Sequence, residues 1–485
     1  MAGNYEKGMY KQLMDVMTRL DNFEKEHKQE VHVLKKEITD LKAENQQLRD
    51  ENRLLQDDNA RLRSIINNDS SNSSLPPSTD QKSGKSANTY NSRTKTARKA
   101  GGQKGRKGTT LTKTDVEAKI QSGKCRHEIE TIGTPTAEKY ITKYVMDLNA
   151  ETVVTEIRIY ADEQGRFNIP AQYRSDVTYG ENVKALAVAL YSEGVMSNDR
   201  IAAFLNAASG DVLELSEGSV YAFCNKMAQK SGKSIVQLES DLLNQSVVAT
   251  DATTITVNGE QNYIRNLSTK DTVVYHAMSS KSIDALKEIE FFNKYSGKLL
   301  HDHETALYHF GTDHAECNVH IIRYLRKNSE ETGNKWSDEM ITLLCSMNEE
   351  RKELIRQGIP SFPEDVIMKY EQGYQELLTK GSSENKTTSH KYARSEEKAL
   401  LNRMEKYAHN HLLFLYDFEV PFGNNISERD LRKAKNRQKM SGGFRKESGN
   451  RMYCSILTII ETLKRRNMGM IENIKKLFTG TPAIF

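Results

Sequence analysis

The sequence is poor in cysteine, tryptophan and proline, with five, one and eight of these among 485 residues. The five cysteines lie far apart and form no Cys-x-x-Cys pair: Cys125, Cys224, Cys317, Cys345 and Cys454. This pattern favours free thiols in a reducing compartment over a disulfide framework. No segment approaches the ~18 unbroken apolar residues of a membrane span, and the N-terminus lacks the apolar core of a secretory signal. We therefore expect a cytoplasmic protein of two to four domains with no membrane partner.

Acidic residues are absent between Lys82 and Lys113, where ten lysines and arginines occur. The net charge of +4 hides this basic segment. Residues 67–114 are rich in Ser, Asn, Gly and Lys, so they cannot bury enough apolar surface to fold alone. A basic linker is often a solvated tether, but cations without anions favour phosphate binding. The predicted DNA contacts in it are Arg93, Lys95, Arg98, Lys99, Lys104, Arg106 and Lys107.

A seven-residue repeat fills residues 1–66. One heptad position holds seven leucines, interrupted only by His27: Leu13, Leu20, Leu34, Leu41, Leu48, Leu55 and Leu62. The position three residues earlier holds Tyr10, Met17, Val31, Ile38, Asn45, Asn52 and Asn59. Leucine at d, with β-branched residues and asparagine at a, is typical of a parallel two-stranded coiled coil. We predict homodimerisation; a long amphipathic helix packed on its own protein is the alternative.

Two smaller regions follow the linker. Residues 115–175 alternate as strands do, in KYVMDLN and TVVTEIRIYAD, which predicts a small β-rich domain. Residues 176–240 have helical periodicity, and two short helices, the second capped by Ser216, resemble a helix-turn-helix. A helical hairpin of this size is as often a core element as a DNA reader.

Residues 241–323 have the strand order of a catalytic core. Three strands precede a helix and a fourth strand, and Asn258-Gly259 predicts a hairpin turn between the first two. In a ribonuclease-H-like sheet the first and fourth strands are neighbours. Asp251 on the first and Asp302 at the end of the fourth are therefore expected to meet.

A third acid is expected on a helix in residues 423–485. Asn424 and Asn425 can cap a helix that carries Glu428. The cations on this helix are Arg429, Arg432, Lys435, Arg437 and Lys439, of which we predict the first two as helpers and the others as DNA contacts. Three carboxylates beside cations suit two Mg²⁺ ions next to a phosphodiester, with Mn²⁺ as a substitute. Each acid also has an ordinary structural interpretation as a turn former, a helix cap or half of a surface ion pair.

Several stretches resemble transposases of the insertion-sequence 66 family. NSSLPPSTD at residues 72–80 and GGQKGRKGTTL at 101–111 are similar to its N-terminal signatures, and VPFGNNISERDLRKAKNRQKMSGGFRKESG at 420–449 closely resembles its C-terminal signature. ATDATTITVNGEQNYIRNLST and HDHETALYHFG resemble the segments around its two aspartates. The resemblance covers nearly the whole chain in the same order. It assigns the metal-binding and catalytic roles to Asp251, Asp302 and Glu428.

The resemblance implies a multidomain α/β protein with a ribonuclease-H-like core and a helical insertion, which residues 324–422 fit. Members often carry a zinc ribbon, but GKCRHEIETIGT offers only Cys125 and His127, so no zinc is predicted. The family's Asp-Glu-Thr is Asp251-Ala252-Thr253 here, which lacks the neighbouring carboxylate. CNVHIIRYL matches a Cys-x-x-His element, which makes His320 a candidate helper, although a lone Cys and His more often pack in a core.

We therefore predict a coiled-coil homodimeric DNA transposase, associated with the bacterial nucleoid, that binds the ends of its own element and joins them to target DNA. Small accessory proteins are potential partners. A catalytically silent DNA-binding protein derived from a transposase is one alternative, although all three acids are present. A metal-dependent nuclease or resolvase on the same fold is the other, and it would not need a long N-terminal half.

Overall fold

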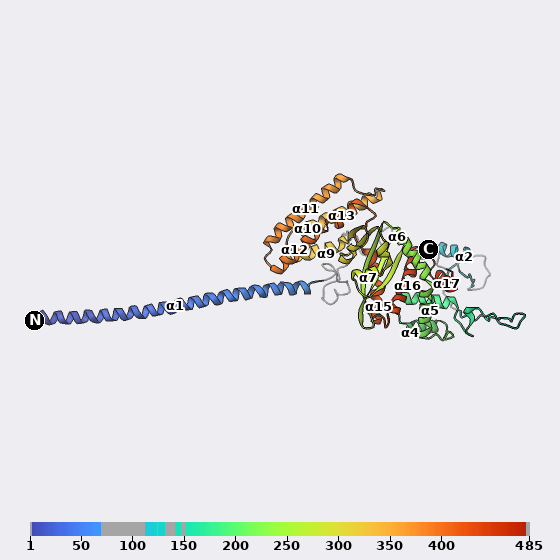
Figure 1. The fold of residues 1–485 in the computed structure, drawn as a ribbon, viewed down its shortest axis with the longest axis horizontal. Coiled ribbons are helices and arrows are strands. Elements are labelled where there is room, and N and C mark those ends of the chain that lie inside the picture. The colour runs from blue at the N-terminus through green and yellow to red at the C-terminus, as the bar shows by residue number, and fades with distance from the viewer. Residues whose placement is uncertain (1, 69–111, 124, 131–140, 147–150, 482–485) are drawn as a thin grey trace. The chain divides into compact units, whose positions relative to one another are not determined.

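The computed structural model describes residues 2–68, 112–123, 125–130, 141–146 and 151–481 (Figure 1). The chain divides into two compact units. We call residues 1–90 with 318–418 the helical unit, and residues 91–317 with 419–485 the sheet unit. The seven predicted DNA contacts of the basic linker, Arg93 to Lys107, lie outside the described residues.

The described part of the helical unit contains no strand. Its helices are α1 (Ala2–Ile66), α9 (Asn318–Thr332), α10 (Trp336–Arg356), α11 (Glu364–Thr387), α12 (Lys391–Lys406) and α13 (Ala408–Tyr416). The helical periodicity expected between residues 324 and 422 is thus confirmed. None of the helices in the described ranges has an apolar stretch long enough to cross a membrane.

A buried carboxylate holds this helical unit together. Glu397 of α12 is completely buried and accepts hydrogen bonds from side chains of α9, α10, α11 and the loops beside them. Its donors are Asn328, Asn334, Trp336, Asn385 and Thr388, at 2.7–3.1 Å. Five neutral donors around one carboxylate satisfy a charge that would otherwise be costly to bury.

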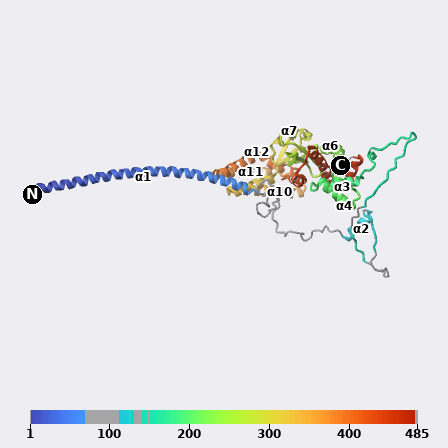
Figure 2. The same cartoon turned by 90° about the horizontal axis from the view of Figure 1, so that it is seen from below.

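Helix α1 is continuous over 65 residues (Figure 2), and the leucines of its heptad repeat are exposed. The predicted d-position leucines on the surface include Leu34, Leu41 and Leu48, each more than half exposed. Near its C-terminal end, α1 packs on α12 of the same unit through Asp57, Ala60 and Ser64. These occupy heptad positions f and b, opposite the leucines. The contact inside the unit therefore leaves the repeat's apolar face uncovered.

The sheet unit is built on one mixed sheet of five strands. The strands are β1 (Val247–Val257), β2 (Glu260–Ser268), β3 (Val273–Met278), β4 (Lys298–His301) and β5 (Asp313–Glu316). Their order is β3-β2-β1-β4-β5; β1, β2 and β3 are antiparallel, and β4 and β5 run parallel to β1. Asn258 and Gly259 both have positive φ in the β1–β2 hairpin, as their sequence predicts.

Helices cover both faces of this sheet (Figure 1). The α-helices of the sheet unit from residue 181 on are α3 (Glu181–Ser192), α4 (Asn198–Ala208), α5 (Glu217–Lys230), α6 (Gly232–Leu243), α7 (Ile283–Lys287), α8 (Glu290–Lys294), α14 (Asn425–Asp430), α15 (Arg432–Ser441), α16 (Glu447–Arg465) and α17 (Met470–Thr479). One core joins Ile255 and Ile264 to α3, α5, α16 and α17. The other joins Val248 and Leu267 to α6, α7 and α8. The two cores use alternate residues of each strand, because successive side chains point to opposite faces.

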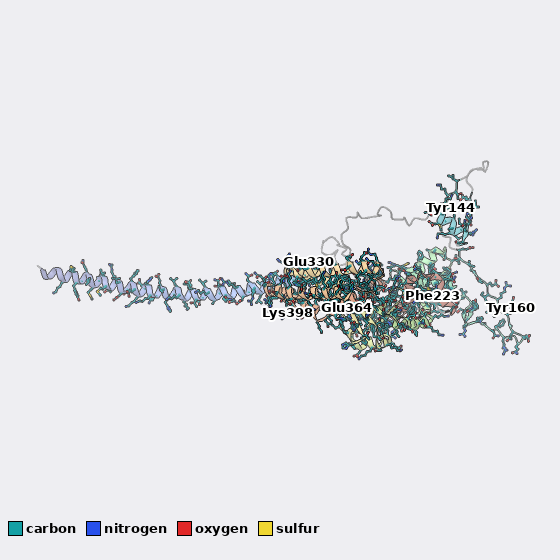
Figure 3. All side chains as sticks on the ribbon, turned by 90° about the horizontal axis from the view of Figure 1, so that it is seen from above. Tyr144, Tyr160, Phe223, Glu330, Glu364 and Lys398 are labelled. Carbon is teal, nitrogen blue, oxygen red and sulfur yellow. The ribbon has the colours of Figure 1, made fainter. Side chains whose placement is uncertain are left out.

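The region from residue 115 to 175 differs from its prediction. It begins with α2 (Lys113–Gln121), capped by Thr112, and includes the short 3-10 helix η2 (Ala171–Tyr173). Its described residues contain no strand, so the small β-rich domain is not observed there. The segment around Tyr160 is an extended arm that turns at Asp162, away from the core around Phe223 (Figure 3). Alternation favours an extended backbone, but a strand also needs a hydrogen-bonded partner.

The predicted pair of short helices is confirmed as α4 and α5. Ser197 and Ser216 cap them, and the Ser216 side chain accepts from the Ser219 backbone at 3.1 Å. The loop of eight residues between them is longer than the turn of a helix-turn-helix. The apolar face of α5, which includes Phe223, is buried in the sheet unit's core. A DNA-reading role for α5 stays a prediction.

Candidate active site

The sheet places Asp251 and Asp302 side by side. Asp251 lies in the middle of β1, and Asp302 directly follows β4. The parallel register pairs Ala249 with Leu300, so its extension by two residues brings Asp302 level with Asp251, on the same face of the sheet. Both side chains are half-buried.

Burial and mutual repulsion make this pair electrostatically unfavourable. Burial first, and then the charge of Asp302, raise the pKa of Asp251 from its ordinary 3.8 to about 6. Lys281, the Ala252 backbone N–H at 2.7 Å and Lys435 oppose this shift. Two poorly solvated carboxylates that repel each other are relieved by a bound cation. Carboxylate oxygens are also the ligands that Mg²⁺ prefers, so the pair fits a divalent ion.

Glu428 reaches the same face of the sheet on α14, which packs on β1 and β2. The helix begins at Asn425, as predicted, but Asn424 makes no side-chain cap. Its Nδ2 instead donates to the Thr250 carbonyl at 3.0 Å, next to Asp251, and its backbone N–H donates to Cys317 Sγ at 3.1 Å. The asparagine therefore ties the helix to the strand. Glu428 itself is half-buried.

A second acid on α14, Asp430, is fully engaged in the core. It forms an ion pair with Arg465 of α16 and accepts from Ser268 Oγ at 2.6 Å and Asn266 Nδ2 at 3.3 Å. Its backbone carbonyl accepts from Tyr275 at 3.1 Å. These partners leave Asp430 poorly placed to bind a metal. Of the two acids on this helix, Glu428 is therefore the better candidate for the third acid of the site.

The opposite face of the sheet carries a buried cation that sequence reasoning missed. Arg265 is completely buried; it forms an ion pair with Glu304 and donates to Thr250 Oγ1 at 3.1 Å. The other oxygen of Glu304, Oε2, lies 3.5 Å from Lys281 Nζ. Arg265 and its neighbour Asn266 point to opposite faces of the sheet, because successive side chains of a strand alternate. Which face each one occupies depends on how β2 pairs with β1, so the sequence alone could not identify the partners of Arg265.

Three histidines, His301, His303 and His314, cluster around the end of β4, where Asp302 lies. His301 Nδ1 accepts from the Glu304 backbone at 3.3 Å, so its Nε2 carries the hydrogen and donates to His314 Nδ1 at 3.2 Å. Burial, followed by His314, lowers the pKa of His301 to about 3, which keeps this histidine neutral. His303 Nδ1 lies 2.5 Å from Glu316 on β5. The His-Asp-His-Glu string was a visible signal, but β5 was not predicted.

The Cys-x-x-His element contributes to both units. In the sheet unit, a carboxylate oxygen of Asp302 and the Sγ of Cys317 lie within 4.8 Å of each other. In the helical unit, His320 is buried on α9 and its Nε2 lies 3.1 Å from Arg323 Nη1. The helper role of His320 and the expected lack of zinc both stay predictions.

The single basic helix predicted after Asn425 is two helices in the structure: Glu428 and Arg429 lie on α14, whereas Arg432, Lys435, Arg437 and Lys439 lie on α15. These predicted cations differ in their surroundings. Arg429, Arg432, Lys435 and Lys439 are exposed, and Lys435 is close enough to Asp251 to lower its pKa. Arg437 is half-buried against Tyr191 and Phe444, with its guanidinium carbon 5.1 and 5.3 Å from their ring centres. Arg437 therefore contributes to packing, and its contact with DNA stays a prediction.

Taken together, the sheet and α14 define an acidic site suited to a divalent cation, bordered by exposed basic side chains. Over residues 177–452, more than half of the chain, the sequence matches the model of the transposase IS66 family. The chain belongs to this family, as its motifs predicted. A comparison with curated proteins gave no match. Membership implies an enzyme that acts on DNA and uses a divalent metal.

Proposed function

We propose that this protein is a DNA transposase that binds the ends of its own insertion sequence and cuts and joins DNA at Asp251, Asp302 and Glu428. The observation that carries the proposal is the adjacent pair of Asp251 on β1 and Asp302 at the end of β4, which burial and repulsion make suited to a divalent ion. The strand order and the parallel β1–β4 pairing support a ribonuclease-H-like core.

The three acids would hold two ions, Mg²⁺ or Mn²⁺. When bound, these ions would activate the attacking oxygen and stabilise the leaving one. The chain's own residues do the rest. Lys435, an exposed cation close enough to Asp251 to lower its pKa, would attract the phosphodiester. The buried Arg265 fixes Glu304 on the opposite face of the sheet, which keeps the end of β4 in place.

We further propose that α1 forms a parallel homodimeric coiled coil, which would bring two element ends into one complex. Its leucine face is exposed, and its contact with α12 uses the opposite face. Asn45, Asn52 and Asn59 at the a position would fix the register at some cost in stability.

The decisive experiment is strand transfer with the element's terminal repeats, Mg²⁺ and a supercoiled target. We expect wild type to join ends to the target and Asp302→Asn to lose joining by several orders of magnitude, because a ligand of the proposed metal site is removed. Asp284→Asn is the matched control, because its carboxylate is 92% exposed on α7.

The same assay separates the alternatives. Binding of the ends by wild type with neither cleavage nor joining, even in Mn²⁺, would favour a silent DNA-binding protein. Cleavage without joining would favour the nuclease. Equal joining by wild type and Asp302→Asn would contradict the assigned site.

A further inference from the structure

One buried amide links the strand of Asp251 to the helix of Glu428. Asn266 on β2 is completely buried and lies opposite Asp251 in the antiparallel register. Its Oδ1 accepts from the Asp251 backbone N–H at 3.0 Å. Its Nδ2 lies 3.3 Å from the Ser427 carbonyl and 3.3 Å from Asp430 Oδ2, both on α14. Asn266 thus bonds both to β1, which carries Asp251, and to α14, which carries Glu428.

The orientation of this amide is fixed by its partners. A backbone N–H can only donate, so the oxygen of Asn266 must face Asp251. The nitrogen must then face α14, where the Ser427 carbonyl and the Asp430 carboxylate accept. Ser268 Oγ lies 3.0 Å from the same nitrogen and donates onward to Asp430 at 2.6 Å. If the amide were flipped, its Nδ2 would face another donor, the Asp251 backbone N–H. Its Oδ1 would then face the two acceptors on α14.

Asp430 makes this link rigid. Its ion pair with Arg465 and its bond from Ser268 hold it between α16 and β2, and Tyr275 on β3 holds its backbone. Glu428 lies two residues before it, in the same short turn of helix. Six residues of helix cannot hold their own position, since isolated helices of this length are unstable. The side chains around Asp430 therefore decide where Glu428 lies.

We propose that Asn266 is a positioning residue. It holds Glu428 at the right place relative to Asp251, acting through Ser427 and Asp430. This rests on the proposed metal site and goes beyond it, because it assigns the placement of the third acid to a neutral residue on a different strand. It also explains why α14 carries a second carboxylate, Asp430, that serves as an anchor.

The test measures Mn²⁺ binding by the full-length protein without DNA, by titration calorimetry. Loss of groups that orient metal ligands typically weakens metal affinity by about 10–100-fold, and we expect Asn266→Ala to lie in that range. The matched control is Thr462→Val. Thr462 is equally buried, and it bonds the β3 backbone at Val273 from α16. We expect the control to lower the melting temperature but to keep wild-type Mn²⁺ affinity.

A swap of the two groups gives a readout that general destabilisation cannot mimic. In Asn266→Asp alone, the new carboxylate would lie against the carboxylate of Asp430, and the two would repel each other. We therefore expect weaker Mn²⁺ binding than in wild type. Combining it with Asp430→Asn restores one amide and one carboxylate, and we expect part of the affinity to return. The combined variant also serves if Asn266→Ala fails to fold.

Three results would overturn the inference, and they are distinguishable. Wild-type affinity in Asn266→Ala would show that Asn266 does not position a ligand. An equal loss of affinity in Thr462→Val would reduce its role to stability. Wild type that binds no Mn²⁺ would remove the metal site itself, and the inference with it.

Discussion

At the scale of single residues, the pKa of Asp251 links the proposed site to protein stability. The folded-state pKa of about 6 lies above the ordinary 3.8, because of burial and then the charge of Asp302. Between pH of about 4 and 6 the folded protein therefore binds more protons than the unfolded chain. Its stability falls as pH rises through that window.

We expect Asp251→Asn to stabilise the metal-free protein at pH 8 by about 1–2 kcal/mol, because it removes a charge that burial and Asp302 disfavour. At pH 4 the substitution should have little effect, since Asp251 is then protonated in the folded state. Melting temperatures in EDTA at both pH values measure this. In Mn²⁺ the order should reverse at pH 8, because only wild type keeps the full ligand set. Destabilisation at pH 8 in EDTA would contradict the proposed repulsion.

At the scale of elements, Glu397 determines how four helices meet. Burial alone would raise its pKa, but the donors led by Asn328, Asn334 and Trp336 outweigh burial and lower the pKa of Glu397 below its ordinary value. A lowered folded-state pKa contributes stability above the unfolded pKa, and this stability is lost as pH falls through the folded pKa. The helical unit should therefore be acid-sensitive.

We expect Glu397→Gln to destabilise the helical unit at pH 7 by about 1–3 kcal/mol, because an amide N–H would face donors. The difference from wild type should shrink at pH values well below 4. Trp336, the sole tryptophan, bonds Glu397 directly, so its fluorescence during urea unfolding reports on this unit. Glu396→Gln, at the adjacent exposed position, should behave like wild type.

The two glycines that follow α15, Gly442 and Gly443, should respond differently to substitution by alanine. Gly443 has φ of +112°, and a Cβ there would clash with the Thr256 carbonyl of β1. Gly442 has φ of +69° with open space around it. Gly442→Ala should cost only the left-handed conformation, about 1–2 kcal/mol. Gly443→Ala should cost clearly more in urea unfolding, because the backbone of β1 must also move. Equal losses would show that the close approach is easily relaxed.

At the scale of the whole molecule, α1 is a long helix with an exposed apolar face. We expect the pair Leu34→Ser and Leu41→Ser to convert a dimer, with twice the 55.2 kDa chain mass, into a monomer. The reason is that each removes a d-position side chain from the proposed seam. Light scattering after size-exclusion chromatography measures the mass.

The control pair is Lys36→Ser and Ala43→Ser, which changes two exposed f positions of the same heptads. This pair should remain dimeric. A wild type that is monomeric at micromolar concentration, or a dimer that survives the leucine substitutions, would contradict the coiled coil.

The sequence by itself determined the family, the long N-terminal helix, the strand that carries Asp251 and the helical nature of residues 324–416. These depend on local patterns: heptads, alternation, caps such as Ser216, and the Asn258-Gly259 turn. Local patterns also misled, because alternation in residues 151–160 predicted strands that have no partner in the described residues.

Only the tertiary structure decided which polar residues act together. Asn266, Arg265 and Asp430 carry no local signal, since asparagine, arginine and aspartate are common on any surface. The β1–β2 register buries Asn266 and Arg265 on opposite faces of the sheet, and the docking of α14 buries Asp430. Partners distant in the sequence therefore determine their roles, because a buried polar group is stable only where another segment of the chain supplies its hydrogen bonds.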